Sequence, residues 1–380
     1  MRIPVFLMLL VCCFSCTRIN KLYVKYGEAR QTLQSYQDSV IRIYMDRKGL
    51  IYPNIPLSDQ LIRTNDSRLE LLYANDENIL QQAATAAGVP GQEDKWIIQD
   101  ALAKQIAREI RGAAQGKTLV YLIHGFNKHP LRPDKSSAYA ENKEMRAKMM
   151  EVYPDRRFQF VEIYWDGCTW ANGWAPLAAF NSMKIWDNAQ PASNNVGVEL
   201  RRILNATGVA QNYVITHSLG ASVATCALFN AEKFAEGDFM TGIRSRYNDT
   251  MNYRTPTGQY RLGIIAPAIP GENTFGEFFD RTPKGSDTTN VKVIVGFNQY
   301  DPVLRKYVNL SAYAGATTLG CRPSELAQVK RQVNSASATY LYDVDFSLTA
   351  KDKKQAVHAF SAYVKNEKAM NSFLEQLFHL

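Results

Sequence analysis

The chain has 380 residues, 46% of them hydrophobic and 21% charged, a balance typical of folded globular domains that excludes a largely disordered protein. The formal net charge is +8 at pH 7, but the basic residues are scattered and only "KDKK" at 351–354 forms a short cluster. Because no basic stripe is interleaved with aromatic residues, we expect no nucleic-acid partner. Attraction to anionic lipid or glycan surfaces is the favoured use of the charge.

The first sixteen residues, "MRIPVFLMLLVCCFSC", have the pattern of an export signal. Arg2 gives a short positive region, and residues 5–14 form an apolar run too short to span a bilayer. A small residue precedes Cys16, which resembles a bacterial lipobox. The sequence therefore predicts a lipoprotein-type signal peptide over 1–16, lipidation of Cys16, and anchoring in the bacterial cell envelope. An ordinary secretory signal is the alternative, because Cys13 stands where a lipobox usually has Leu.

Three cysteines remain beyond the signal: Cys168, Cys226 and Cys321. Their number is odd and their spacing fits no metal site, so neither a zinc site nor a disulfide framework is predicted. Cys226 lies in an apolar stretch and is expected to belong to the core. Whether Cys168 and Cys321 pair is left open.

Residues 17–115 are mixed and polar, and we expect them to form an N-terminal extension. Within it, "IRIYMDRKGLIYP" at 41–53 predicts a hairpin that turns at Arg47-Lys48-Gly49 and adds edge strands to a sheet. Further on, apolar residues recur every four positions, as on an amphipathic helix that covers a sheet, at Ile98, Leu102, Ile106 and Ile110.

From residue 116 onward, strand and helix patterns alternate. Strand patterns, of which 118–123 is a continuous apolar run typical of a central buried strand, occupy 118–123, 158–164, 212–216, 262–266, 291–295 and 340–346. Helical patterns occupy 137–152, 194–205, 219–232, 273–280 and the C-terminal end. This alternation predicts an α/β fold with a mainly parallel, doubly wound sheet and flanking helices over 116–380. In such sheets, functional residues gather at the carboxyl ends of the strands.

Ser218 lies at one of these ends, in "THSLGAS", directly before a helix of small residues. This is the context of a nucleophile elbow, in which a serine projects from a sharp strand-to-helix turn. The usual motif is G-x-S-x-G; Gly220 supplies the second glycine, and Thr216 replaces the first. The alternative is an ordinary serine at a strand–helix junction.

A second loop, in "VYLIHGFN" at 120–127, follows the first central strand. In an elbow-type site, an oxyanion is bound by one backbone N–H from such a loop and by the N–H of the residue after the nucleophile. These donors would be Phe126 and Leu219. His124 would shape the loop and would not transfer protons.

A nucleophilic serine needs a base and an acid that orients it. Of the five histidines, His358 in "AVHAFSAYV" follows the last strand, where a hydrolase histidine loop belongs. Asp301 in "NQYDPVL" follows the strand at 291–295, which gives the chain order Ser, Asp, His that is usual for this fold. Asp166 and Glu272 are the rival acids, and a turn aspartate before proline is the structural alternative for Asp301.

Taken together, these motifs resemble the α/β-hydrolase superfamily, and more narrowly its DUF900-type, lipase-like bacterial branch. The resemblance covers about residues 116–380 and implies an α/β-hydrolase fold with Ser218, Asp301 and His358 as the triad. It implies a serine hydrolase of carboxylic esters (an esterase, lipase or deacylase) without metal or cofactor. An inactive hydrolase-fold lipoprotein that serves as a binding or scaffold module is the alternative.

Four of the five tryptophans lie in "YWDGCTWANGWAPLAAFNSMKIW", which starts at the carboxyl end of a strand. Large aromatic rings line ligand pockets well, so Trp165 and Trp170 are expected to overhang the nucleophile and favour a small-molecule or lipid ester with a hydrophobic group. The alternative is that the rings only pack the long crossover to the next strand.

Overall fold

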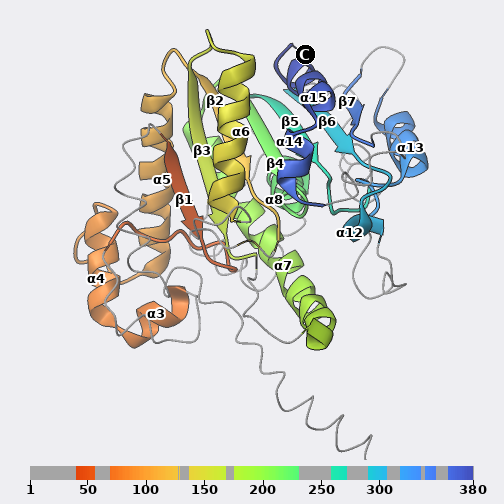
Figure 1. Ribbon diagram of the computed structural model, residues 1–380. Coiled ribbons are helices and arrows are strands. Elements are labelled where there is room, and N and C mark those ends of the chain that lie inside the picture. Colours follow the sequence, from red (N-terminus) through yellow and green to blue (C-terminus); the bar gives the residue numbers. More distant parts are fainter. Residues whose placement is uncertain are drawn as a thin grey trace, which may run out of the picture.

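A sheet of seven parallel strands forms the centre of the computed structural model, and helices cover both of its faces (Figure 1). The strand order is β1-β3-β2-β4-β5-β6-β7, and each neighbouring pair is parallel. The strands are β1 (Ile41–Met45), β2 (Thr118–Ile123), β3 (Phe158–Trp165), β4 (Gln211–His217), β5 (Gln259–Ile265), β6 (Val291–Phe297) and β7 (Leu341–Asp345). The predicted α/β class is thereby confirmed.

The structure describes residues 40–55, 69–126, 128, 137–167, 175–230, 258–271, 290–305, 317–334, 339–347 and 358–379. Its helices are α3 (Leu69–Asn75), α4 (Glu77–Ala86), α5 (Lys95–Ala113), α6 (Ala138–Val152), α7 (Ala175–Thr207), α8 (Gly220–Thr225), α12 (Pro302–Arg305), α13 (Pro323–Val333), α14 (Phe360–Val364) and α15 (Glu367–His379). A π-helical turn, η2 (Cys226–Asn230), continues α8. None of the helices in these ranges is long and apolar enough to cross a membrane.

The helices divide between the two faces of the sheet according to their contacts. α6 contacts α14, and α15 packs on β5, β6 and β7, so these three helices cover the face that points forward in Figure 1. α7 contacts α5 and α8, and α8 packs on β4 and β2. The two groups make the fold a three-layer sandwich, as expected for a doubly wound sheet.

Local sequence signals account for the starts of several helices. Asp94 and Ser137 precede α5 and α6, and their side chains accept hydrogen bonds from the N–H groups of Trp96 and Ala140. Such caps satisfy donors that the first helical turn leaves free. In α5, three of the four residues of the predicted apolar stripe are buried, Ile98, Leu102 and Ile110. The helix expected at 194–205 is longer, since α7 spans 175–207, and the one expected at 273–280 lies outside the described residues.

The region expected as an extension contributes an edge strand, but not a two-stranded hairpin. β1 pairs in parallel with β3, and after a turn at Gly49 (φ 81°) the chain makes a single antiparallel bridge, between Met45 and Ile51. The reason is that the backbone N–H and C=O of Ile51 are both bound by the side-chain amide of Gln99 on α5, at 2.7 and 3.0 Å. A helix side chain therefore replaces the continued strand ladder.

A buried charge cluster ties this edge strand and α6 to the sheet. Glu162 on β3 is fully buried and forms ion pairs with Arg42 of β1 at 3.1 Å and with Arg146 of α6 at 3.0 Å. Tyr164 donates a further hydrogen bond to it at 2.7 Å. Because a buried carboxylate is costly without such partners, the cluster fixes where α6 lies on the sheet.

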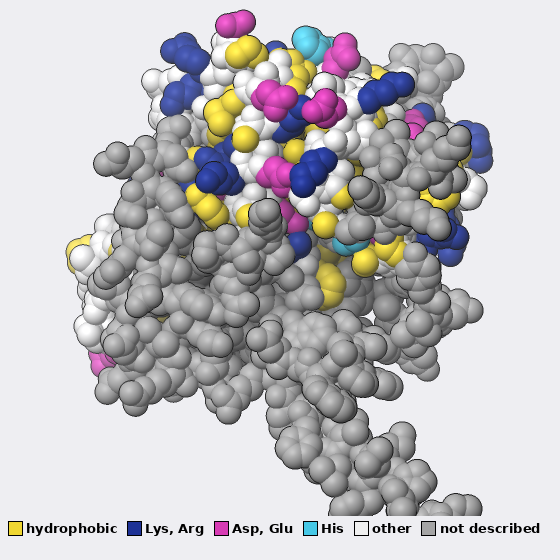
Figure 2. Space-filling model, in the orientation of Figure 1, with side chains coloured by type: hydrophobic (Ala, Val, Ile, Leu, Met, Phe, Trp, Pro, Cys, Tyr) yellow, Lys and Arg dark blue, Asp and Glu magenta, His cyan; other side chains and the backbone are white. Residues whose placement is uncertain are grey.

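On the described part of the face in Figure 2, acidic and basic side chains are interspersed over the upper helices and are not sorted by sign. Mixed charge of this kind is typical of a solvated surface.

The sheet reverses its winding direction at β2. The chain passes from β2 to its neighbour β3 through α6, and then returns through α7 to β4 on the other side of β2. At such a switch point, the loops after the two strands diverge and leave a crevice at their carboxyl ends. The loops in question begin at His124, after β2, and at Ser218, after β4.

Candidate active site

Ser218 occupies a strained turn between β4 and α8. Its φ angle is +53°, a left-handed conformation that residues other than glycine adopt rarely. The turn is held from both sides: the N–H of Ser218 donates to the C=O of Ile265 at 3.0 Å, and its C=O accepts from Ala268 at 3.1 Å. Ser218 is buried, and the turn brings its Oγ to 2.8 Å from a ring nitrogen of His358.

The two small positions around Ser218 have different explanations. A Cβ at Gly220 would lie 2.6 Å from the carbonyl oxygen of His124, so the close approach of α8 to the β2 loop requires glycine there. Thr216, two residues before the serine, is buried between Ile123 of β2 and Ile264 of β5. Its backbone keeps the parallel register with both strands, and its hydroxyl is buried.

The three residues of the expected triad come together. Nε2 of His358 lies 2.8 Å from Oγ of Ser218, and Nδ1 of His358 lies 2.7 Å from Oδ2 of Asp301. They come from three separated segments, at the end of β4, after β6 and before α14. Asp301 is fully buried, whereas 17% of the His358 side chain is exposed. The exposed part gives a substrate access to the imidazole.

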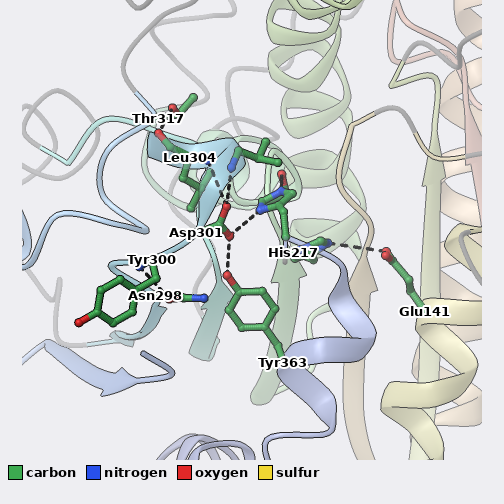
Figure 3. Close-up of polar contacts among 11 residues, drawn as sticks. Glu141, His217, Asn298, Tyr300, Asp301, Leu304, Thr317 and Tyr363 are labelled. Atoms are coloured by element: carbon green, nitrogen blue, oxygen red, sulfur yellow. Dashed lines mark hydrogen bonds and ion pairs between the residues drawn. The ribbon is translucent and has the colours of Figure 1, made fainter. Parts of the chain in front are cut away.

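Asp301 has a full set of hydrogen-bond donors (Figure 3). Its Oδ1 accepts from the N–H groups of Val303 and Leu304 at the start of α12, at 3.0 and 3.1 Å. Its Oδ2 accepts from His358 and from the hydroxyl of Tyr363, at 2.7 and 2.5 Å. Burial opposes ionisation, but the interactions with His358, Tyr363 and Leu304 outweigh it and lower the pKa of the Asp301 carboxyl. The carboxylate is therefore ionised and fixed in orientation.

Tyr363 is a site residue that the sequence did not reveal. It lies in α14, five residues after His358, and its side chain is buried, so its pattern is that of an ordinary core tyrosine. Burial and the nearby Asp301 charge raise its pKa, and its hydroxyl stays protonated as a donor. The sequence feature that could have identified Tyr363 is its position five residues after His358, in the same short segment.

The loop after β2 lies directly over the nucleophile. A Cβ at Gly125 would be 2.9 Å from Cβ and 3.5 Å from Oγ of Ser218, which explains the glycine. The two residues expected to donate to an oxyanion, Phe126 and Leu219, adjoin this contact: Phe126 follows Gly125, and Leu219 follows Ser218 at the start of α8. Both residues therefore directly follow the point at which the β2 loop and the Ser218 turn approach each other.

His124 supports this loop and takes no part in the triad. Its Nε2 accepts from the backbone N–H of Trp165 at 3.1 Å, so Nδ1 carries the proton and donates to the C=O of Gly125 at 2.7 Å. Burial lowers its pKa to about 4, so the ring is neutral. The expectation that His124 shapes the loop fits these contacts.

The expected role of Trp165 needs correction. Its side chain is fully buried, stacks on His124 with 5.7 Å between ring centroids, and donates from Nε1 to the His124 C=O at 2.9 Å. Because both the ring and its N–H contact His124, Trp165 packs against the loop after β2 and does not line an open pocket. Trp170 lies outside the described residues.

The other candidate residues are distributed as follows. Asp166 is buried after β3, where its N–H donates to Met45, and His358 pairs with Asp301. Cys226 and Cys321 are buried and form no disulfide in the described ranges, and Cys226 is confirmed as a core residue. The described ranges contain no cluster of three or more His, Cys, Asp or Glu side chains able to hold a metal. Glu272, Cys16 and Cys168 fall outside those ranges.

In comparisons with known proteins, no protein-family model, no curated protein and no solved structure matches the chain. The chemistry of the site is therefore inferred from its geometry.

Proposed function

We propose that the protein is a serine hydrolase with an α/β-hydrolase fold that cleaves carboxylic esters through Ser218, His358 and Asp301. The observation that carries the proposal is the continuous hydrogen-bond chain from Ser218 Oγ through His358 to Asp301, at 2.8 and 2.7 Å, on a serine with a φ angle of +53°. A nucleophile, its base and the acid that orients the base are the parts that acyl transfer needs.

The steps follow from the positions of the atoms. Ser218 Oγ attacks the carbonyl carbon of the ester while His358 Nε2 takes its proton, and the charge that develops on the carbonyl oxygen is stabilised by the N–H groups of Phe126 and Leu219. The tetrahedral intermediate then expels the alcohol, which receives the proton from His358. Water then attacks the acyl carbon while it loses a proton to the same nitrogen. As the second intermediate collapses, Ser218 Oγ takes that proton from His358 and the acid is released. Asp301 stabilises the imidazolium in both halves.

The intact hydrogen-bond chain favours an enzyme over an inactive binding or scaffold module. A module without activity would have no need for the strained serine, which costs on the order of 1–3 kcal/mol. It would also have no need for a buried carboxylate with four donors. The strained backbone is a cost to folding that a reaction explains, and the four donors hold an ionised carboxylate in one orientation toward His358.

The test is labelling with a fluorophosphonate probe. We expect covalent labelling of the wild type and none of Ser218→Ala. Ser222→Ala is the matched control, because Ser222 lies one helical turn away and its hydroxyl is bound to Ser193 and Asn194; it should label like the wild type. A folded wild type that resists the probe would support the binding-module alternative. A series of p-nitrophenyl esters of increasing acyl length then reports the preferred group.

The proposed location is the bacterial cell envelope, through a lipid on Cys16. Each buried acyl methylene of an anchor contributes about 0.8 kcal/mol of membrane affinity, so detergent should be needed to extract the protein. Cys16→Ser should move it to the soluble fraction. An unchanged distribution of that variant would favour an ordinary secretory signal.

A further inference from the structure

A second carboxylate–histidine pair lies directly behind the triad. His217, the residue before Ser218, is buried, and its ring centroid is 5.0 Å from that of His358 and 5.1 Å from that of Phe360. Nδ1 of His217 faces Oε2 of Glu141, on α6, at 3.7 Å (Figure 3). The imidazole of His217 thus packs against the imidazole of His358.

The carboxylate of this pair is already neutralised by a cation. Lys128 lies 2.7 Å from the other oxygen of Glu141, Oε1, and comes from the segment after β2. Burial opposes the charge on Glu141, but His217 and Lys128 outweigh it and lower its pKa to about 2. Glu141 is therefore ionised, and Lys128 shares its charge with His217.

His217 itself is held without a charge. The charged and titratable groups around it are Glu141 from α6, Lys128, His124 from the end of β2, His358 from the segment before α14, and Tyr363 of α14, whose ring centroid is 6.1 Å away. Burial lowers the pKa of His217; Glu141 opposes this, whereas His358 and Lys128 add to it. Burial makes the largest contribution to this balance; Lys128 opposes the attraction of Glu141, so its loss shifts the balance toward the protonated imidazole.

We propose that Lys128, Glu141 and His217 form a positioning unit that keeps an uncharged imidazole packed against the catalytic His358; the inference rests on the proposed hydrolase function. When His358 takes the proton of Ser218 it becomes positively charged. A second positive charge one ring away, in a buried site of low dielectric, would oppose that step. A neutral His217 leaves the step unopposed.

Lys128→Gln is the variant that tests the unit. It leaves Glu141 charged and unpaired beside His217, and an opposite charge at this distance favours the protonated imidazole by about one pH unit or more. We expect the pH at which fluorophosphonate labelling falls to half to move upward by about one unit, with little change at pH 9. Lys148→Gln is the matched control, because Lys148 is also largely buried but pairs with Glu151 on α6; its profile should be that of the wild type.

The double variant Lys128→Gln/Glu141→Gln provides the decisive comparison. It removes both charges, so His217 should return to its neutral state and the labelling profile should return to that of the wild type. A profile that stays shifted in the double variant would overturn the inference, and so would an unshifted Lys128→Gln.

NMR of the histidine side chains keeps this inference separable from the proposed function. With ¹³C-labelled histidine, the His217 signal, assigned with His217→Phe, should titrate at a higher pH in Lys128→Gln than in the wild type. This readout needs no activity. A wild type that resists the probe would reject the hydrolase, whereas a labelled wild type whose His217 does not respond to Lys128→Gln would reject only the positioning unit.

Discussion

The molecule holds two carboxylate–histidine pairs side by side, and their geometries differ. In the Asp301–His358 pair the nitrogen and oxygen are 2.7 Å apart, and the second ring nitrogen reaches Ser218. In the Glu141–His217 pair the distance is 3.7 Å, and the ring faces other side chains. A carboxylate and an imidazole therefore form a hydrogen-bonded chain to Ser218 in one place and a more distant, buried pair in the other.

The difference lies in what surrounds each carboxylate. Asp301 receives hydrogen bonds from two backbone N–H groups, a tyrosine and the histidine, and no cation pairs with it in the described structure. Its charge is thus directed at His358. Glu141 lies 2.7 Å from Lys128 and 3.7 Å from His217, so its charge is shared between the two. Both histidines face a carboxylate; His358 differs in the shorter distance to it and in a second ring nitrogen that reaches Ser218.

The largest effect is expected from removing the carboxylate of the Asp301–His358 pair. Asp301→Asn keeps the size of the side chain but favours the wrong imidazole tautomer, and we expect ester turnover to fall by about 10⁴. Circular dichroism should show an unchanged fold. Near-normal turnover in this variant would mean that another group orients His358.

Removing the tyrosine that supports the same acid should have the next largest effect. A hydrogen bond to a charged group contributes about 1.5–3 kcal/mol, so Tyr363→Phe should slow turnover by roughly 10- to 100-fold. The acidic side of the pH–turnover profile of Tyr363→Phe should also move to higher pH, because Asp301 loses a hydrogen-bond donor and becomes harder to ionise. Tyr121→Phe, at a buried tyrosine of β2, is the control. Equal effects of the two substitutions would show that Tyr363 has only a packing role.

His124, which packs under the loop after β2, should make the free energy of unfolding depend on pH. The pKa of His124 is about 4 in the folded state against an ordinary 6.5, so the unfolded chain binds the proton first as the pH falls. Stability should be fully present above about pH 6.5 and decline toward pH 4, by about 2 kcal/mol at pH 5 from this residue. Urea unfolding at pH 7 and pH 5 measures this, and His124→Gln should reduce the difference by that amount.

The smallest effect is expected from removing the acid of the second pair. Glu141→Gln leaves His217 neutral, because burial and Lys128 both disfavour its protonated form. Turnover at pH 8 should stay close to that of the wild type, in contrast to Asp301→Asn. A loss as large as that of Asp301→Asn would make the two pairs equivalent and remove the distinction between them.

Much of the framework was predictable from the sequence. The apolar runs located β2 to β7 to within a few residues, because a strand buried on both faces must be apolar along its length. The triad residues could be chosen because each comes after a predicted strand and because they occur in the chain order Ser218, Asp301, His358. The hairpin at 41–53 was wrong in part, since its second arm is bound by Gln99, a long-range partner that local patterns do not reveal.

Side-chain partners depend on the fold alone. Trp165 is a large aromatic residue at the end of a strand, as a pocket residue would be. The contacts of its ring and N–H with His124 bury it instead. Tyr363 and Glu141 have the patterns of ordinary helix residues, and their positions beside Asp301 and His217 become visible only after α14 and α6 pack on one face of the sheet.

The sequence by itself determined the order of strands and helices and the residue types available for chemistry, because periodicity and turn residues act over a few positions. The tertiary structure alone decided which carboxylate faces which histidine, and with what charge. Those choices depend on distances between segments separated by as many as 140 residues in the chain, as with Ser218 and His358. They depend also on burial, which shifts protonation in ways that local sequence does not encode.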